Sequence, residues 1–257
     1  MKWLRKEKTE KKEKTTEKTN DLRLSIKDYI FPPVHAQGIV AALIALFITL
    51  IVIGWSRGLN LLGVLFLMIT AAVYYFFRDP NRIVPQEKGL IVAPADGIVS
   101  NIVTKMPPKE MQLGSEPLTR ISIFMSVFNV HINRTPIEGT VTHINYVPGK
   151  FLNVADKDNE DNERKQYTLE TAEGVKVGFI QIAGLIARRI YTYPSVKEGA
   201  TLKTGERFGL IRFGSRLDVY LPKGVVPQVF IGQTMVAGET VLARLGTQPT
   251  QYNGESI

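Results

Sequence analysis

Two apolar segments near the N-terminus constrain the fold of this chain more than any other feature. Residues Gly38 to Trp55 contain no charged side chain, and a second uncharged run, Leu59 to Phe77, follows directly after Ser56-Arg57-Gly58. A bilayer core of about 30 Å takes about 20 such residues as a helix, so each run is just long enough to span it. The sequence therefore predicts an N-terminal transmembrane helical hairpin.

The charges around the two apolar runs predict how the hairpin is oriented. Lysines and arginines of the N-terminal tail, with Arg78 and Arg82 after the second run, outnumber the single Arg57 between the runs. Positive residues favour the cytoplasmic side, so both termini are expected there. A cleaved signal peptide fits poorly, because a long charged tail precedes the first run and a second run follows it. An apolar hairpin inside a soluble protein is the alternative.

The composition divides the chain into three parts and indicates which class of partner it binds. We expect a polar, basic tail at residues 1–36, a membrane anchor of two apolar helices at 37–77, and a β-rich catalytic domain at 78–257. The net charge of +8 favours an anionic partner, here anionic membrane lipid and not nucleic acid. The absence of cysteine excludes disulfides and thiolate metal sites, and three histidines make a histidine-rich metal site improbable, so no metal is predicted.

Two internal repeats predict the fold of the C-terminal part. The pattern of Val196–Phe208 recurs as Val229–Val241 at a constant offset of 33 residues, and that of Asp96–Ile102 matches Glu138–Ile144. Such spacing indicates one supersecondary unit used twice. The first repeat resembles the V-x-x-G-x-x-V-x-x-G turn of biotinyl and lipoyl carrier domains. We therefore predict a mainly β fold, a flattened, barrel-sandwich-like β-sandwich of two quasi-repeated halves.

The segment between the two copies carries a Gly214-Ser215 pair with apolar residues on both sides. Its simplest interpretation is a hairpin turn, because glycine supplies the positive φ that a turn needs. A carrier role is weakened, since the tip lacks a modifiable lysine. The other interpretation is self-cleavage, in which the Ser215 hydroxyl attacks the preceding carbonyl, which no Cβ shields. The pair alone does not decide between the turn and the cut.

A series of motifs in fixed order favours self-cleavage at Gly214-Ser215 over a plain turn. The motifs are Phe77–Arg82, Ala95–Gly97, Met125–Pro136, Asp161–Arg164, Ile182–Arg189 and Phe213–Val219. Together they resemble the bacterial phosphatidylserine decarboxylases, in particular the short membrane-anchored form, over roughly residues 70 to 245. The ordered set is far more specific than any one member.

The resemblance implies a pyruvoyl-dependent carboxy-lyase made as a zymogen. Autocatalytic cleavage between Gly214 and Ser215 would turn Ser215 into a covalent pyruvoyl group, and a Schiff base to that group would accept the electrons released with CO₂. The implied reaction converts phosphatidylserine to phosphatidylethanolamine at the cytoplasmic face of the bacterial inner membrane. The implied partners are phosphatidylserine, anionic lipid and the two cleavage chains, and a homo-oligomer is compatible with the sequence.

The resemblance also assigns a base and a carboxylate for the cleavage. It places His131 as the histidine of the Met125–Pro136 motif and Asp96 as the acid that orients it. The longer relatives carry a second histidine in this motif, where this chain has Arg134. His131 is therefore expected to serve cleavage, protonation of the product, or both, with a structural histidine as the alternative. Asp96 has a turn-forming alternative, and Asp218 is a weaker second candidate for the carboxylate.

Substrate binding is expected from two further segments. Arg188 and Arg189 suit bidentate contacts to phosphate or carboxylate, and adjacent residues on a strand point to opposite faces, so one of them is expected to face the site. Lys150 and Phe151, with the acidic loop that follows, are expected to cover the headgroup, a plain surface loop being the alternative.

Two rival functions remain from the sequence. A pyruvoyl decarboxylase of a soluble amino acid would give no reason for the two apolar runs. A membrane-tethered β-sandwich adaptor would use Gly214-Ser215 only as a turn.

Overall fold

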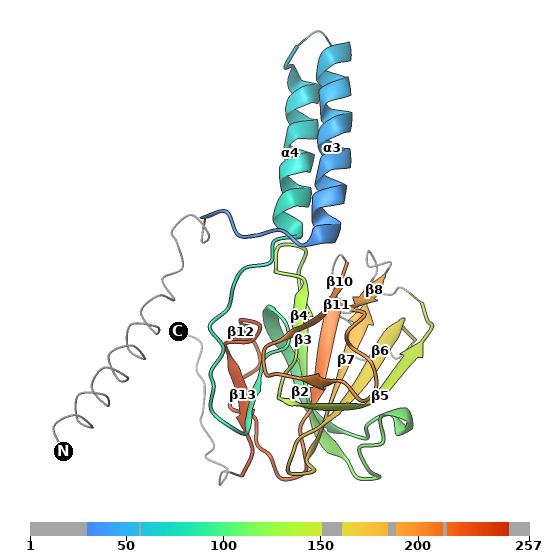
Figure 1. Cartoon of the computed structure of the whole chain (residues 1–257), viewed down its shortest axis with the longest axis vertical. Coiled ribbons are helices and arrows are strands. Elements are labelled where there is room, and N and C mark those ends of the chain that lie inside the picture. Colours follow the sequence, from blue (N-terminus) through green and yellow to red (C-terminus); the bar gives the residue numbers. More distant parts are fainter. Residues whose placement is uncertain (1–29, 57, 151–160, 185–188, 213–214, 247–257) are drawn as a thin grey trace, which may run out of the picture.

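The structure is a computed structural model that describes residues 30–246 except 57, 151–160, 185–188 and 213–214. Two apolar helices lie side by side at one end of a β-rich domain (Figure 1). The elements are α3 (Ala36–Trp55), α4 (Leu61–Phe76), β1 (Leu90–Val92), β2 (Gly97–Lys105), the 3₁₀ helix η1 (Lys109–Met111), β3 (Leu118–Met125), β4 (Ile132–Arg134), β5 (Gly139–Val147), β6 (Arg164–Glu170), β7 (Lys176–Ala183), β8 (Ile190–Thr192), β9 (Thr201–Leu202), β10 (Arg207–Ile211), β11 (Ser215–Tyr220), β12 (Thr234–Met235) and β13 (Val241–Arg244).

The two predicted apolar helices are present, and they pack against each other. The hydroxyl groups of Thr49 and Thr70 hydrogen-bond between them at 2.9 Å, and Asn60 caps α4 by accepting from the Gly63 N–H at 3.0 Å. In the described part of the chain, α3 is the one helix long and apolar enough to cross a membrane, while α4, with 16 residues, is shorter. Most apolar side chains of both helices are exposed to their surroundings.

An antiparallel sheet of eight strands forms the centre of the β domain, in the order β12-β2-β3-β11-β7-β6-β5-β9. The strand β11 lies in the middle, paired along its whole length with β3 on one side and β7 on the other. All six of its residues are buried. A mainly β fold with a curled antiparallel sheet is therefore confirmed, and the finer division into a flattened sandwich goes beyond these pairings.

The internal repeats have a structural counterpart at the two ends of this sheet. The N–H of Gly199 donates to the carbonyl of Val141 at 2.8 Å, and the N–H of Gly232 donates to the carbonyl of Val99 at 2.7 Å. Both glycines have a positive φ, which a turn at this position requires and which other residues rarely adopt. As a result β9 pairs with the start of β5 in the same way that β12 pairs with the start of β2.

The two faces of β11 have different surroundings. Leu217 and Val219 belong to the main apolar core, whereas Arg216 and Asp218 point to the other face, because side chains alternate along a strand. There the Asp218 carboxylate lies 2.9 Å from Arg216 Nε and 3.7 Å from Arg120 Nη1, and all three side chains are buried. Asp218, the second candidate for the carboxylate, thus lies on the opposite face of the strand from Ser215.

We predict that Asp218→Asn destabilises the fold. Its loss leaves the buried Arg120 without the one ion pair it makes among the described residues, which costs about 3 kcal/mol. Urea unfolding in detergent, in a Ser215→Ala background that keeps one chain, measures the change. Glu116→Gln, which breaks an exposed ion pair with Lys223, is the control and changes stability by less than about 0.5 kcal/mol. Equal midpoints for Asp218→Asn and its parent would contradict the prediction.

Candidate active site

Ser215 is the first residue of the central strand, and its side chain is fully buried. It pairs with Met125 of β3 and with Ala183 of β7. Its hydroxyl donates to the sulfur of Met125 at 3.3 Å. A thioether is a weak acceptor, so among the described residues the buried hydroxyl makes no strong hydrogen bond. Gly214, the other half of the predicted cleavage site, lies outside the described residues.

A chain of buried polar groups runs beneath Ser215. Asn133 donates to the same Met125 sulfur at 3.8 Å and accepts from Gln181 at 2.8 Å. The Tyr167 hydroxyl donates to Gln181 at 2.8 Å and lies 2.6 Å from the Thr192 hydroxyl. Burial raises the pKa of Tyr167 far above its usual value. Neither Asn133 nor Gln181 was predicted from the sequence. Gln181 interrupts the apolar run of β7, which is a detectable signal, whereas Asn133 stands between Ile132 and Arg134 and gives no such signal.

His131 lies just before β4 and packs against Phe76 at the end of α4, with ring centroids 4.2 Å apart. Its Nδ1 lies 2.9 Å from the carbonyl of Asn129, which can only accept, so Nδ1 carries the proton of the neutral ring. Nε2 is buried and has no partner among the described residues. Burial, aided by the positive charge of Arg78, lowers the pKa of His131 to about 4. His131 is therefore neutral at pH 7 with a free lone pair on Nε2.

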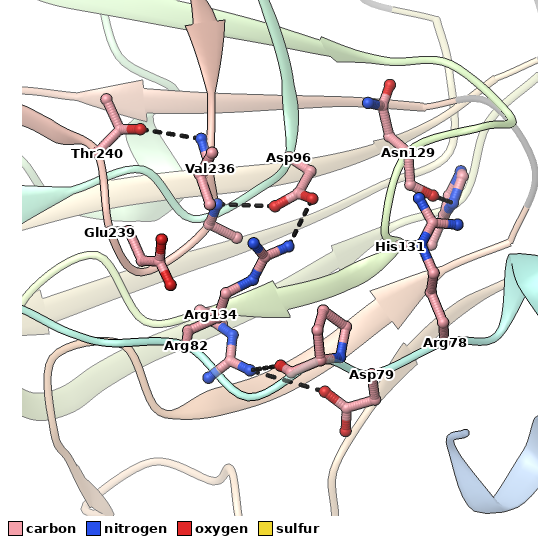
Figure 2. Close-up of polar contacts among 12 residues, drawn as sticks. Arg78, Asp79, Arg82, Asp96, Asn129, His131, Arg134, Val236, Glu239 and Thr240 are labelled. Carbon is pink, nitrogen blue, oxygen red and sulfur yellow. Dashed lines mark hydrogen bonds and ion pairs between the residues drawn. The ribbon is translucent and has the colours of Figure 1, made fainter. Parts of the chain in front are cut away.

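Asp96 immediately precedes β2 and lies at the same end of the sheet as Ser215, since Ile98 of β2 pairs with Phe124 of β3. Its carboxylate accepts from Arg82 Nη2 at 2.7 Å and from the Ala237 N–H at 2.8 Å (Figure 2). Within the described residues no hydrogen bond joins Asp96 to His131, and Figure 2 shows the two side chains in separate groups.

Arg134, which stands where longer relatives have a second histidine, binds backbone carbonyls. Its guanidinium donates to Gly205 O at 3.0 Å. It also donates to Pro80 O at 3.0 Å and lies 3.6 Å from the Asp79 carboxylate (Figure 2). Burial lowers the pKa of Arg134 to about 10, so it stays charged at pH 7. These contacts tie the segment after α4 to β4 and to the turn before β10.

The start of α3 contacts the segment that leads to Ser215. Arg212 donates to the side chain of Gln37 at 2.8 Å, and the His35 N–H donates to Phe77 O at 2.9 Å. The His35 ring also packs edge-on against Tyr193 at 5.6 Å. The end of the sheet that holds Ser215 is thus held directly against the base of the helix pair (Figure 1).

The described structure places only two of the expected substrate-binding residues. Arg189 is exposed just before β8, and Lys150 is exposed and forms an ion pair with Asp161 at 3.2 Å. Arg188 and Phe151 lie outside the described residues. The described contacts therefore do not bring Arg189 or Lys150 to Ser215.

Comparison with known proteins decides the family. The family model described as phosphatidylserine decarboxylase matches residues 69–243, which include Asp96, His131 and Ser215. The chain belongs to the phosphatidylserine decarboxylase family.

Curated members of the phosphatidylserine decarboxylase family are similar over nearly all of their length. A protein of Ruegeria pomeroyi named phosphatidylserine decarboxylase proenzyme is 52% identical over 229 residues, covering 86% of this chain and 100% of the relative. Proteins with the same name from Cereibacter sphaeroides and Zymomonas mobilis are 53% identical over 223 residues and 48% identical over 248 residues. Their matches cover 86% and 94% of this chain, and 94% and 98% of the relatives.

The low pKa of His131 predicts how stability depends on pH. The unfolded histidine binds a proton below about pH 6.5 and the native one only below about pH 4, so stability falls as the pH drops between these values, by about 3 kcal/mol in total. Urea unfolding at both ends of this range, in the Ser215→Ala background, compares His131 with His131→Gln. His131→Gln should therefore lose about 3 kcal/mol less stability than its parent over this pH range. An equal loss of stability with and without His131 would contradict the low pKa of His131.

We also predict that Gln181→Leu destabilises the protein by about 2 kcal/mol, because Asn133 and Tyr167 each lose a buried partner. Thermal unfolding in detergent measures the loss. Gln86→Leu, at an exposed position, is the control and should have little effect. If both substitutions lower the midpoint of thermal unfolding equally, the buried polar groups around Gln181 contribute nothing specific to stability.

Proposed function

We propose that this chain is a phosphatidylserine decarboxylase that forms phosphatidylethanolamine and CO₂, using a pyruvoyl group made from its own Ser215. The observation that carries the proposal is the position of Ser215. It begins the central strand, is fully buried, and lies at the sheet end that contacts the apolar helices. Membership of a family whose curated relatives are named proenzymes supports it further.

In the proposed processing step, Ser215 Oγ attacks the Gly214 carbonyl, and the acyl group moves from the Ser215 nitrogen to the oxygen. Elimination then breaks the Cβ–O bond and releases a chain that ends in the Gly214 carboxylate. The dehydroalanine left at position 215 tautomerises, adds water and loses ammonia, which leaves a pyruvoyl group. His131 is the proposed base, because it is neutral at pH 7 and its buried Nε2 has no other partner among the described residues.

The surroundings of Ser215 fit such a group. Pairing with β3 and β7 at all six residues of β11 would hold a new chain end in place after the cut. The contact of Oγ with the Met125 sulfur is weak, so little is lost when this oxygen leaves. The pyruvoyl group would supply the electron sink for loss of CO₂. Asp96 stays the proposed carboxylate, with Arg82 and the Ala237 N–H as its present partners.

We propose that α3 and α4 cross the bacterial inner membrane as a hairpin that follows the tail 1–36 and occupies 37–77. The domain 78–257, a flattened sandwich in this proposal, would lie on the cytoplasmic side. Its site end would then face the lipid headgroups. One of Arg188 and Arg189 is the proposed ligand of the substrate phosphate or carboxylate, and Lys150 and Phe151 the proposed cover.

The two rival functions make different predictions. A membrane-tethered adaptor would need no chemistry at Ser215, and a decarboxylase of a soluble amino acid would not need its site beside apolar helices. The family match disfavours both, and the contact between Arg212 and Gln37 disfavours the soluble-substrate rival as well.

Release of CO₂ by the purified protein tests the proposed reaction. Wild type should release CO₂ from phosphatidylserine in detergent micelles and not from free serine. Ser215→Ala should release none, because the cofactor cannot form, while it keeps the fold. Release from free serine alone would favour the soluble-substrate rival, and undiminished release by Ser215→Ala would refute the role of Ser215.

A further inference from the structure

The turn between β3 and β4, residues 126–129, carries an apolar tip. The side chain of Phe128 is 75% exposed and that of Val127 is 37% exposed, although the strand before them is almost wholly buried. Figure 1 shows this connection reaching the base of the helix pair. Nothing in the proposed chemistry at Ser215 requires a large aromatic side chain at this tip.

The turn pairs the backbone N–H groups of three of its four residues within itself. The N–H groups of Ser126 and Phe128 donate to the side chains of Asn129 and Ser126 at 2.8 and 3.3 Å. The Asn129 N–H donates to Ser126 O at 3.0 Å, and Phe128 O accepts from Arg78 at 2.6 Å. Each N–H group that is paired in this way lowers the cost of moving the turn out of water. The pairing therefore favours contact of the tip with apolar surroundings.

Arg78 fixes the height of the tip relative to α4. It follows the last turn of that helix, donates to Tyr75 O at 2.8 Å, and lies 3.7 Å above the Tyr75 ring. Tyr74 and Tyr75 are exposed on the same turn of α4. Tyrosines at a helix end, followed by an arginine, are typical of the level where the hydrocarbon core meets the headgroups. The Phe128 carbonyl accepts a hydrogen bond from Arg78, so the tip lies at the same depth as this end of α4.

We infer that the tip Val127–Phe128 inserts into the boundary between headgroups and acyl chains of the bilayer that holds α3 and α4. The inference rests on the proposed membrane anchoring and adds a second contact, made by the catalytic domain itself. Phe128 is three residues from His131, whose ring packs on Phe76 of α4. The contact would hold the site end at the surface where the headgroup of a bilayer lipid lies.

Phe128→Ser tests the contact by comparing two forms of one substrate. In proteoliposomes of phosphatidylcholine that contain long-chain phosphatidylserine, the variant should decarboxylate about tenfold more slowly, as expected when one aromatic side chain no longer reaches apolar surroundings. On soluble dibutyryl phosphatidylserine the rate should match wild type. Met106→Ser is the matched control, since Met106 is an equally apolar, 49% exposed residue beyond the far end of β2 from Asp96.

A direct probe separates membrane contact from other roles. In a Trp3→Phe, Trp55→Phe background, the fluorescence of Phe128→Trp should be quenched by brominated phosphatidylcholine, and that of Met106→Trp should not. Absence of quenching, or equal loss of activity of Phe128→Ser on both substrates, would overturn the inference, the second result showing a role inside the site. If wild type releases no CO₂ from either substrate, the proposed function fails, while the quenching result still decides the membrane contact.

Discussion

The pairing of β11 with β3 on one side and β7 on the other is the constraint on which the rest of this structure depends. It buries Ser215 completely at the start of a central strand and sets Met125 and Ala183 beside it. A chain that cuts its backbone at this point would be expected to lose the new end to solvent. Here the new end would remain held by two ladders of hydrogen bonds, so rigidity and chemical reactivity are compatible at the same residue.

The second constraint is that this end of the sheet is held against the helices. His131 packs on Phe76, Arg212 binds Gln37, and Arg78 joins α4 to Phe128. These contacts come from two separate segments of the β domain, the connection between β3 and β4 and the end of β10, so the position of the site relative to α3 and α4 does not depend on a single loop. The proposed substrate is a lipid that stays in the bilayer. A site held at a fixed position beside the membrane helices could reach such a lipid without its first leaving the bilayer.

The sequence predicted local features better than it predicted contacts between distant segments of the chain. Apolar runs gave the two helices, and repeated glycines gave the turns of Gly199 and Gly232, because both signals act over a few residues. The order of motifs led to the family. The ion pair of Asp96 with Arg82 and the chain through Asn133 and Gln181 depend on contacts between distant segments, which a single sequence does not reveal. The face of β11 on which Asp218 lies could have been predicted, since Asp218 is three positions after Ser215 on one strand and an odd spacing places two side chains on opposite faces.

The mass of the purified wild-type protein under denaturing conditions tests the central claim most directly. The account predicts two chains, a larger one that ends at Gly214 and a smaller one that begins with a pyruvoyl group at position 215 and reacts with hydroxylamine. The two masses should add up to the mass of the uncut chain plus one water and less one ammonia, because the dehydroalanine takes up water and releases ammonia. A single intact chain of 28.7 kDa in protein that releases CO₂ from phosphatidylserine would contradict it.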